Sequence, residues 1–260
     1  MSRSRFSICA AFVICCVLAA TVQAAPTVDL TTINATGMIN GAWFYEVHAA
    51  PTGSGNIQSF VRIGKDQDNP AITQGYNTEA RPVEYDENTS PTFTRPLLLS
   101  DVPVVDLSGT LYREFLLDIN QNKTGDGRLL SLDTIEIYQS DDGTLGGPGV
   151  HAGGFPGTLV YDMDGLADSW ILLDYALNHG SGTGDMFAYI PDSLFIDEDY
   201  VYLYSMFGAS EGSLHPNTAS FEEWAVRKDV DTPPIPAPGA WLLGAIGIGV
   251  VGHLRRRRIV

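Results

Sequence analysis

The chain has 260 residues, with 31 Asp and Glu against 15 Lys and Arg, and a formal net charge of −16 at pH 7. Six of the basic residues lie in the two terminal segments, so the body between them holds nine basic and 31 acidic residues, a net charge of −22. Such a body repels nucleic acid and anionic lipid, which excludes both as its partners. All three cysteines (Cys9, Cys15 and Cys16) precede this body, which therefore has neither disulfides nor thiolate ligands.

The N-terminus has the three parts of a secretory signal peptide. Arg3 and Arg5 give a basic start, residues 6–20 are apolar, and Val22-Gln23-Ala24 follows the small-x-small rule for signal peptidase. We expect cleavage after Ala24, which removes residues 1–24 and exports the remainder.

The last 28 residues combine a proline-rich hinge, an apolar run and a basic cluster. Prolines at 233, 234, 236 and 238 hold the chain extended, and residues 239–254 contain no Asp, Glu, Lys or Arg. About sixteen residues give ~24 Å of helix, short of the ~30 Å hydrocarbon core, and arginine stems can snorkel across the difference. Four adjacent arginines argue against a buried helix at the end of a soluble domain and predict a single transmembrane helix with a cytoplasmic end.

This layout resembles the PEP-CTERM sorting signal of Gram-negative bacteria that make extracellular polysaccharide. The resemblance implies recognition by exosortase, a membrane-embedded, transpeptidase-like enzyme. Ala237 stands where the usual signal has Glu. Four stretches of the body also loosely resemble ectodomains that precede such tails, and these ectodomains have no established activity. The stretches are FLLDINQNKTGDGRLLSLDTIEIY, SWILLDYALNHGSGTGDM, YVYLYSMFG and FEEWAV. The matching signal residues are Pro236, Ala237 and Pro238, followed by Arg255, Arg256, Arg257 and Arg258.

Short segments of alternating hydrophobicity separated by Gly, Asn and Asp turns predict an all-β body at residues 25–231. We expect a β-sandwich of jelly-roll type, followed by the linker, membrane helix and arginine cluster at 232–260. The stretch 93–105 contains two prolines and is typical of an edge strand or an extended crossing. Loops are predicted at 64–91, 120–131 and 141–157, and strands at 42–48, 57–63, 114–119, 132–138, 159–161, 169–175, 185–190, 200–207 and 221–227.

Two acidic loops place Asp and Asn oxygens at alternate positions, as a hard cation such as Ca²⁺ requires. The same residues are typical of turns in which the side chain bonds its own backbone, so both interpretations stay open. The first loop has Lys123 and Leu129 where an EF-hand loop needs Gly and Glu. The candidate ligands are Asp118, Asn120, Asn122 and Asp126 in the first loop, and Asp162, Asp164 and Asp168 in the second.

Aromatic side chains offer a possible glycan site. The period of two places Tyr200, Tyr202 and Tyr204 on one face of a strand, where rings could stack on sugars, although packing of that face into the core is the alternative. No catalytic residue is assigned, because the sequence contains no H-E-x-x-H and no two of its histidines stand four residues apart.

The sequence favours a non-enzymatic component of the cell surface or biofilm matrix. Signal peptidase and exosortase are the expected processing partners. The inner membrane is the expected first location, followed by the periplasm, outer surface or extracellular matrix. No cofactor is expected apart from the calcium of the acidic loops. The alternatives are a carbohydrate-binding module or adhesin, calcium-braced and bound to extracellular polysaccharide, and a secreted glycan hydrolase.

Overall fold

A computed structural model describes residues 27–47, 57–64, 71–178, 184–209, 215–219 and 221–227. The predicted signal peptide and the whole sorting signal, from Pro236, Ala237 and Pro238 to Arg255, Arg256, Arg257 and Arg258, lie outside these ranges. Within them, no helix has the length and apolar character needed to cross a membrane. The segment predicted to do so, 239–254, is outside the described residues.

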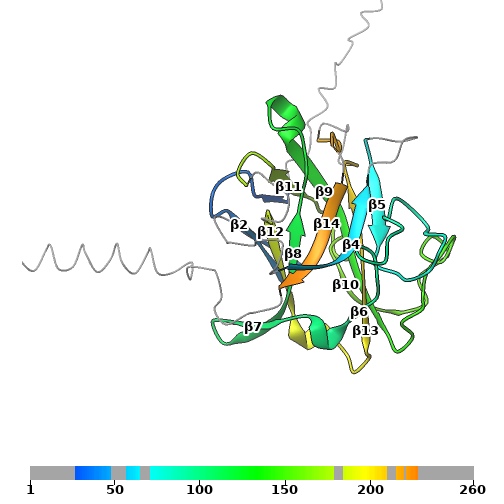
Figure 1. The fold of residues 1–260 in the computed structure, drawn as a ribbon. Helices are drawn as coiled ribbons and strands as arrows, with labels where there is room; N and C mark the ends of the chain where they lie inside the picture. The colour runs from blue at the N-terminus through cyan, green and yellow to red at the C-terminus, as the bar shows by residue number, and fades with distance from the viewer. Residues whose placement is uncertain are drawn as a thin grey trace, which may run out of the picture.

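The described chain forms two mostly antiparallel sheets, which confirms the all-β class (Figure 1). Apart from three 3₁₀ turns, η1 (Leu99–Asp101), η2 (Gly125–Arg128) and η3 (Asp192–Leu194), it contains no helix. Sheet A has the order β1 (Val28–Asp29), β11 (Ile171–Asp174), β9 (Leu129–Ser140), β13 (Tyr200–Phe207) and β5 (Thr73–Tyr76), with β10 (Thr158–Asp162) on β9 and β6 (Leu97–Leu98) on β13. Sheet B has the order β2 (Thr36–Ile39), β3 (Ala42–Glu46), β12 (Met186–Pro191), β8 (Thr110–Asp118), β14 (Phe221–Arg227) and β4 (Ile57–Gly64), with β7 (Val104–Leu107) on β8.

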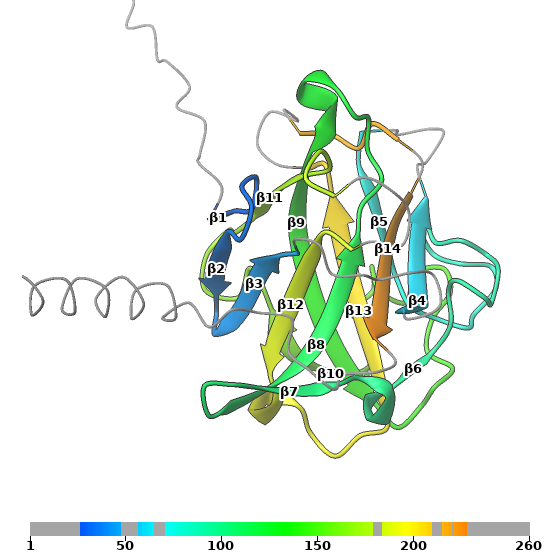
Figure 2. The ribbon, with the colours of Figure 1, turned by 60° about the vertical axis from the view of Figure 1, so that its left-hand side comes forward.

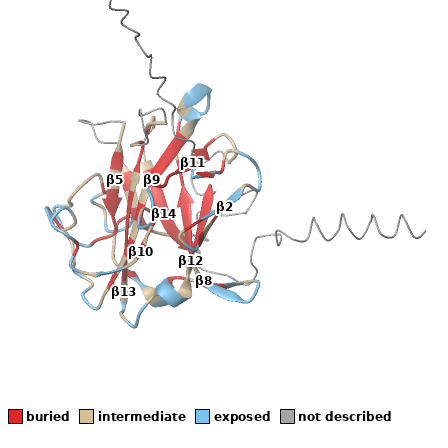
Figure 3. Ribbon diagram, turned by 180° about the vertical axis from the view of Figure 1, so that it is seen from behind, coloured by how far each residue is buried: buried red, intermediate tan, exposed pale blue. Residues whose placement is uncertain are grey.

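The core lies between the sheets, because alternate residues of the long strands point inward. Figure 2 shows β12, β8 and β14 crossing in front of β9 and β13. Ile135 and Ile137 of β9 meet Phe115 and Leu117 of β8 in one buried cluster. Trp224 of β14 is fully buried there, and its indole N–H donates to the Ser205 hydroxyl of β13 at 3.0 Å, which joins the sheets. Buried residues follow the strands and exposed residues the loops (Figure 3).

The alternation of apolar and polar residues predicted the positions of most of the longer strands, but not which strands pair with one another. The strands predicted at 200–207 and 221–227 are confirmed at both ends. The predicted loop at 64–91 is wrong in part, because β5 lies within it and pairs with β13. Its sequence, TQGY, offers no alternating pattern. The successive strands β8 and β9 belong to different sheets.

Candidate functional site

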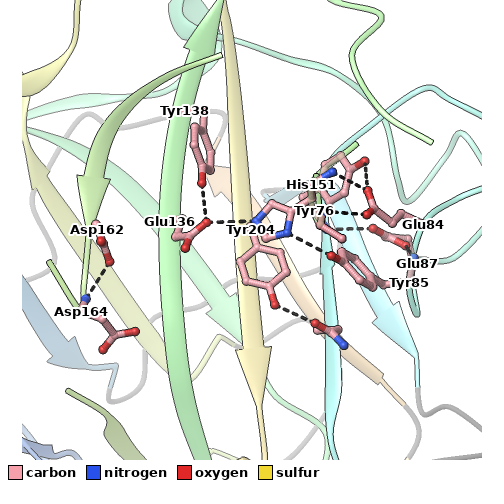
Figure 4. A network of polar contacts seen from close by, with 12 residues as sticks. Tyr76, Glu84, Tyr85, Glu87, Glu136, Tyr138, His151, Asp162, Asp164 and Tyr204 are labelled. Atoms are coloured by element: carbon pink, nitrogen blue, oxygen red, sulfur yellow. Dashed lines mark hydrogen bonds and ion pairs between the residues drawn. The ribbon is translucent and has the colours of Figure 1, made fainter. Parts of the chain in front are cut away.

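Tyrosine, glutamate and histidine side chains gather on the outer face of sheet A (Figure 4). Since Ile135, Ile137 and Leu203 point into the core, their neighbours Glu136 and Tyr204 point to the other side. Tyr76 of β5 and Tyr138 of β9 also belong to this face, and loops at 77–96 and 141–157 cover it and contribute the other side chains. We call the group the His151 cluster; its members are Tyr76, Glu84, Tyr85, Glu87, Glu136, Tyr138, His151 and Tyr204.

His151 is at the centre of the cluster. Its Nε2 lies 3.0 Å from a Glu136 carboxylate oxygen and its Nδ1 lies 3.1 Å from the Tyr85 hydroxyl. A neutral ring with the proton on Nε2 donates to Glu136 and accepts from Tyr85, so both nitrogens are satisfied. The ring also stacks on Tyr204, with centroids 3.9 Å apart and planes 21° from parallel. This one side chain therefore connects a loop to β9, β13 and the second loop.

Glu84 joins the two covering loops through backbone bonds. The N–H groups of His151 and Ala152 donate to its two carboxylate oxygens at 2.8 and 2.9 Å, and the Tyr76 hydroxyl donates at 2.9 Å. Glu87 accepts the backbone N–H groups of Tyr76 and Tyr85 at 3.1 and 2.7 Å. Loop 77–96 is thus held to β5 and to loop 141–157 by charge-assisted hydrogen bonds, which are the stronger kind.

Within the cluster, the pKa of Glu136 is lowered, whereas the pKa values of the neighbouring Tyr85 and Tyr138 are raised. The hydrogen bond from His151 lowers the pKa of Glu136, and the Tyr138 hydroxyl, 2.5 Å from the carboxylate, adds to this effect. Burial, together with a smaller contribution from neighbouring Glu84, raises the pKa of Tyr85 to about 12. Near neutral pH the Tyr138 and Tyr76 phenols therefore remain protonated donors to the ionised carboxylates of Glu136 and Glu84. Such an arrangement holds two loops on a sheet.

The three tyrosines proposed for glycan binding do share the outer face, as alternation predicted. Tyr202 and Tyr204 are only 1% and 6% exposed, and Tyr200 is half-buried. The Tyr202 hydroxyl donates to the Asp142 carbonyl at 2.6 Å, and that of Tyr204 to the Gln74 side chain at 2.7 Å. Two of the three rings are thus covered by loops on the outside of the sheet and do not enter the core between sheets.

The candidate ligands of the first acidic loop lie in different surroundings and bond to different residues. Asp118 is buried at the end of β8, whereas Asp126 is exposed in η2. The Asn120 N–H donates to Glu222 at 2.9 Å, and the Asn122 amide donates to the Thr218 carbonyl at 3.4 Å.

The second acidic loop forms turns of its own. The Asp162 carboxylate accepts the Asp164 N–H at 2.8 Å, and the Asp164 carboxylate accepts the Ser169 N–H at 2.9 Å; Asp168 is exposed. Burial raises the pKa of nearby Asp133 to about 6, and Asp164 and Asp168 contribute to the increase. Across the described ranges, no group of three or more His, Cys, Asp or Glu side chains is placed to hold a metal ion.

A second cluster, of buried carboxyl groups that the sequence did not single out together, lies at the end of β8 and at the beginnings of β12 and β14. Its members are Asp118, Asp185 and Glu222. The Ile119 N–H donates to Asp185 at 2.8 Å, while Glu222 accepts the Asn120 N–H at 2.9 Å and the Gln121 amide at 2.6 Å. Burial raises the pKa of Asp185 well above its usual range, and Asp118 and Glu222 add to the shift. Burial also raises the pKa of Glu222, to about 8.

No family model, curated protein or solved structure matches this chain. The roles of both clusters are therefore inferred from their own geometry. A partial signal for Glu222 was present, because the alternation of FEEWAVR places it on the same side of β14 as Trp224. No local signal identified His151, since its partners Tyr85 and Glu136 are 66 and 15 residues away along the chain.

Proposed function

We propose that this protein is an exported component of the cell surface or biofilm matrix, displayed as a folded β body and sorted through its C-terminal tail. In this proposal the body is a β-sandwich of jelly-roll type, and residues 239–254 form one membrane helix. The proposal rests on the sequence of residues 233–260, in which a proline-rich part, an apolar part and an arginine-rich part follow one another. They follow closely in sequence on the last strand of the described residues, β14, which ends at Arg227.

The arrangement of the aromatic side chains favours this proposal over a sugar-binding role for the tyrosine face. Stacking on a pyranose needs an uncovered ring. Tyr202 and Tyr204 have their rings beneath the loops and their hydroxyls bonded within the protein. A sugar could reach them only by displacing loop 141–157. The calcium-braced module lacks support for a similar reason, since Asp162 and Asp164 accept backbone N–H groups.

Localisation in a Gram-negative host that contains exosortase tests the proposal. We expect an epitope-tagged body to lose the tail and to reach the outer surface or the medium. Replacing Arg255, Arg256, Arg257 and Arg258 by Ala should abolish this processing, because the charges that fix the cytoplasmic end of the helix are gone. The matched control is Ala237→Glu, which restores the usual residue of the signal and should be processed at least as well as the original chain.

Two outcomes would overturn the proposal. One is an unprocessed chain in the inner membrane whether or not exosortase is present. The other is equal release of the arginine variant and the original chain, which would show that the tail is not read as a sorting signal.

A further inference from the structure

A glutamine amide and a threonine hydroxyl lie against each other where the loop after β8 meets the segment before β14. Figure 2 shows these two segments at the same end of the molecule. Gln121 is buried, with 3% of its surface exposed, and its amide oxygen Oε1 lies 2.8 Å from the hydroxyl oxygen Oγ1 of Thr218. The two residues are 97 positions apart in the sequence, so only the fold brings them together.

The neighbours of Gln121 fix the orientation of its amide. The backbone N–H of Thr218 can only donate, so the atom that lies 2.8 Å from it is the amide oxygen. The amide nitrogen then faces a Glu222 carboxyl oxygen at 2.6 Å and the Asn217 side-chain oxygen at 3.3 Å. One end of the amide therefore meets a hydroxyl and a backbone N–H, and the other end meets a carboxyl group.

The Thr218 hydroxyl is placed to act as a nucleophile. It can donate its proton to the Gly127 carbonyl at 2.6 Å, and its oxygen accepts the Asn122 N–H at 3.2 Å. A hydroxyl oxygen has two lone pairs, so one lone pair remains for the Gln121 amide. Because Oε1 is bonded directly to the amide carbon, the contact also holds the hydroxyl beside that carbon. Two groups held together in this way react far faster than the same groups free in solution.

Two further groups favour attack on this amide. The Thr218 N–H donates to the amide oxygen, on which negative charge develops during attack, as a donor of an oxyanion hole does. Glu222 is fully buried, and burial, with a smaller contribution from Asp118, raises the pKa of its carboxyl group to about 8. Near neutral pH this carboxyl group therefore holds a proton beside the nitrogen that must leave, as a general acid requires.

We propose that the folded chain joins Thr218 to Gln121 by an intramolecular ester bond. The bond from Oγ1 to the amide carbon forms, and the bond from that carbon to Nε2 breaks. Glu222 gives its proton to the nitrogen, which leaves as ammonia, while the hydroxyl proton passes to water and Glu222 regains a proton from water. The ester gives the body at 25–231, which contains no cysteine, a covalent link that disulfides cannot provide. This proposal does not depend on the proposed function.

Peptide mapping of the purified full-length chain at neutral pH tests the proposal. Trypsin and a glutamate-specific protease together place Gln121, Thr218 and Gln139 on three different peptides. The first two peptides should be found joined, with a mass about 17 Da below their sum, which is the mass of the ammonia lost. Mild hydroxylamine treatment, which cleaves esters and leaves peptide bonds intact, should separate them. Gln139 is the internal control, because its buried Oε1 accepts the Ile196 N–H, and its peptide should remain unjoined.

Three variants test the roles of the side chains. Thr218→Val keeps the shape of the residue but removes the nucleophile, so the link should be absent. Glu222→Gln removes the acid and should slow formation of the link about a hundredfold. The matched control is Thr124→Val, which alters an exposed threonine of the same loop and should leave the link unchanged.

The first measurement needs no variant, so the proposal can fail even if a variant does not fold. Unjoined peptides of full mass from the original chain overturn it. A link that persists in Thr218→Val also overturns it. A link that forms equally fast in urea would show that the fold does not bring the two groups together for reaction, and would overturn the proposal as well.

Discussion

Arg227 and Glu114 form an ion pair that is almost removed from water. Their side chains are 12% and 1% exposed, and the Tyr189 hydroxyl also donates to Glu114 at 3.1 Å. Arg227→Met would leave a buried carboxylate without its counter-charge, which typically costs about 3–5 kcal/mol of unfolding free energy. Urea unfolding at neutral pH measures this loss.

The double variant Arg227→Met with Glu114→Gln is the control. It removes the charge as well as its partner, so it should recover a large part of the lost stability. A double variant as unstable as the single one would show that packing of the Arg227 stem matters more than charge.

Glu222 makes stability depend on pH. Burial raises its pKa from 4.5 to about 8 in the folded protein, so between these values the folded state holds a proton that the unfolded state releases. This contribution is complete below pH 4.5 and is lost as the pH rises through 8, at up to about 1.4 kcal/mol per pH unit. The pKa of Asp185 is raised also, and acts in the same direction.

We therefore expect the free energy of unfolding to fall between pH 5 and pH 8, and Glu222→Gln to flatten that slope. Denaturant unfolding across this range measures both. A steeper slope in the variant would contradict the assignment of the effect to Glu222. Measurements above pH 5 avoid the opposing contribution of Glu136, whose pKa is lowered and whose stabilisation is lost in acid.

At the scale of elements, the His151 cluster holds loops 77–96 and 141–157 on sheet A. His151→Phe keeps a ring on Tyr204 but removes the bonds to Glu136 and Tyr85. Losing these two part-buried hydrogen bonds should cost about 1–3 kcal/mol. Faster hydrogen exchange should be confined to the two loops, because His151 bonds to Glu136 of sheet A and to Tyr85, and stacks on Tyr204 of the same sheet.

Tyr85→Phe is the matched control for the His151 substitution. It removes the hydrogen bond to Nδ1 but leaves the bond between His151 and Glu136 in place, and should cost about 1 kcal/mol. Exchange that increased equally in β8 and β12 of sheet B would instead indicate global destabilisation, and would contradict the role of His151 as a local clamp.

At the scale of the whole molecule, we expect the folded body to be stable without calcium. The carboxylates of Asp162 and Asp164 accept backbone N–H groups, as turn residues do, and within the described ranges no group of three or more His, Cys, Asp or Glu is placed to hold a metal ion. The thermal midpoint in millimolar Ca²⁺ should equal that in EDTA. A rise with Ca²⁺ that Asp162→Ala abolishes would contradict this expectation and would place a cation in this loop.

The sequence by itself determined the class of the fold and the positions of its long strands. Period-two alternation in YVYLYSMF and FEEWAVR is a local property of the chain, so β13 and β14 could be predicted to the residue. Weak segments such as TQGY carry no such pattern, and β5 forms there because β13 offers it a partner. The alternation also placed Tyr200, Tyr202 and Tyr204 on one face, without indicating what covers it.

Only the tertiary structure decided which strands pair and which side chains meet. Sheet membership depends on contacts between distant segments, so β8 and β9, adjacent in sequence, separate into opposite sheets. His151 meets Glu136 and Tyr85 because two loops fold over the same strands. Burial likewise gives Glu222 its raised pKa, since the desolvation of a carboxyl depends on everything packed around it and not on its neighbours in sequence.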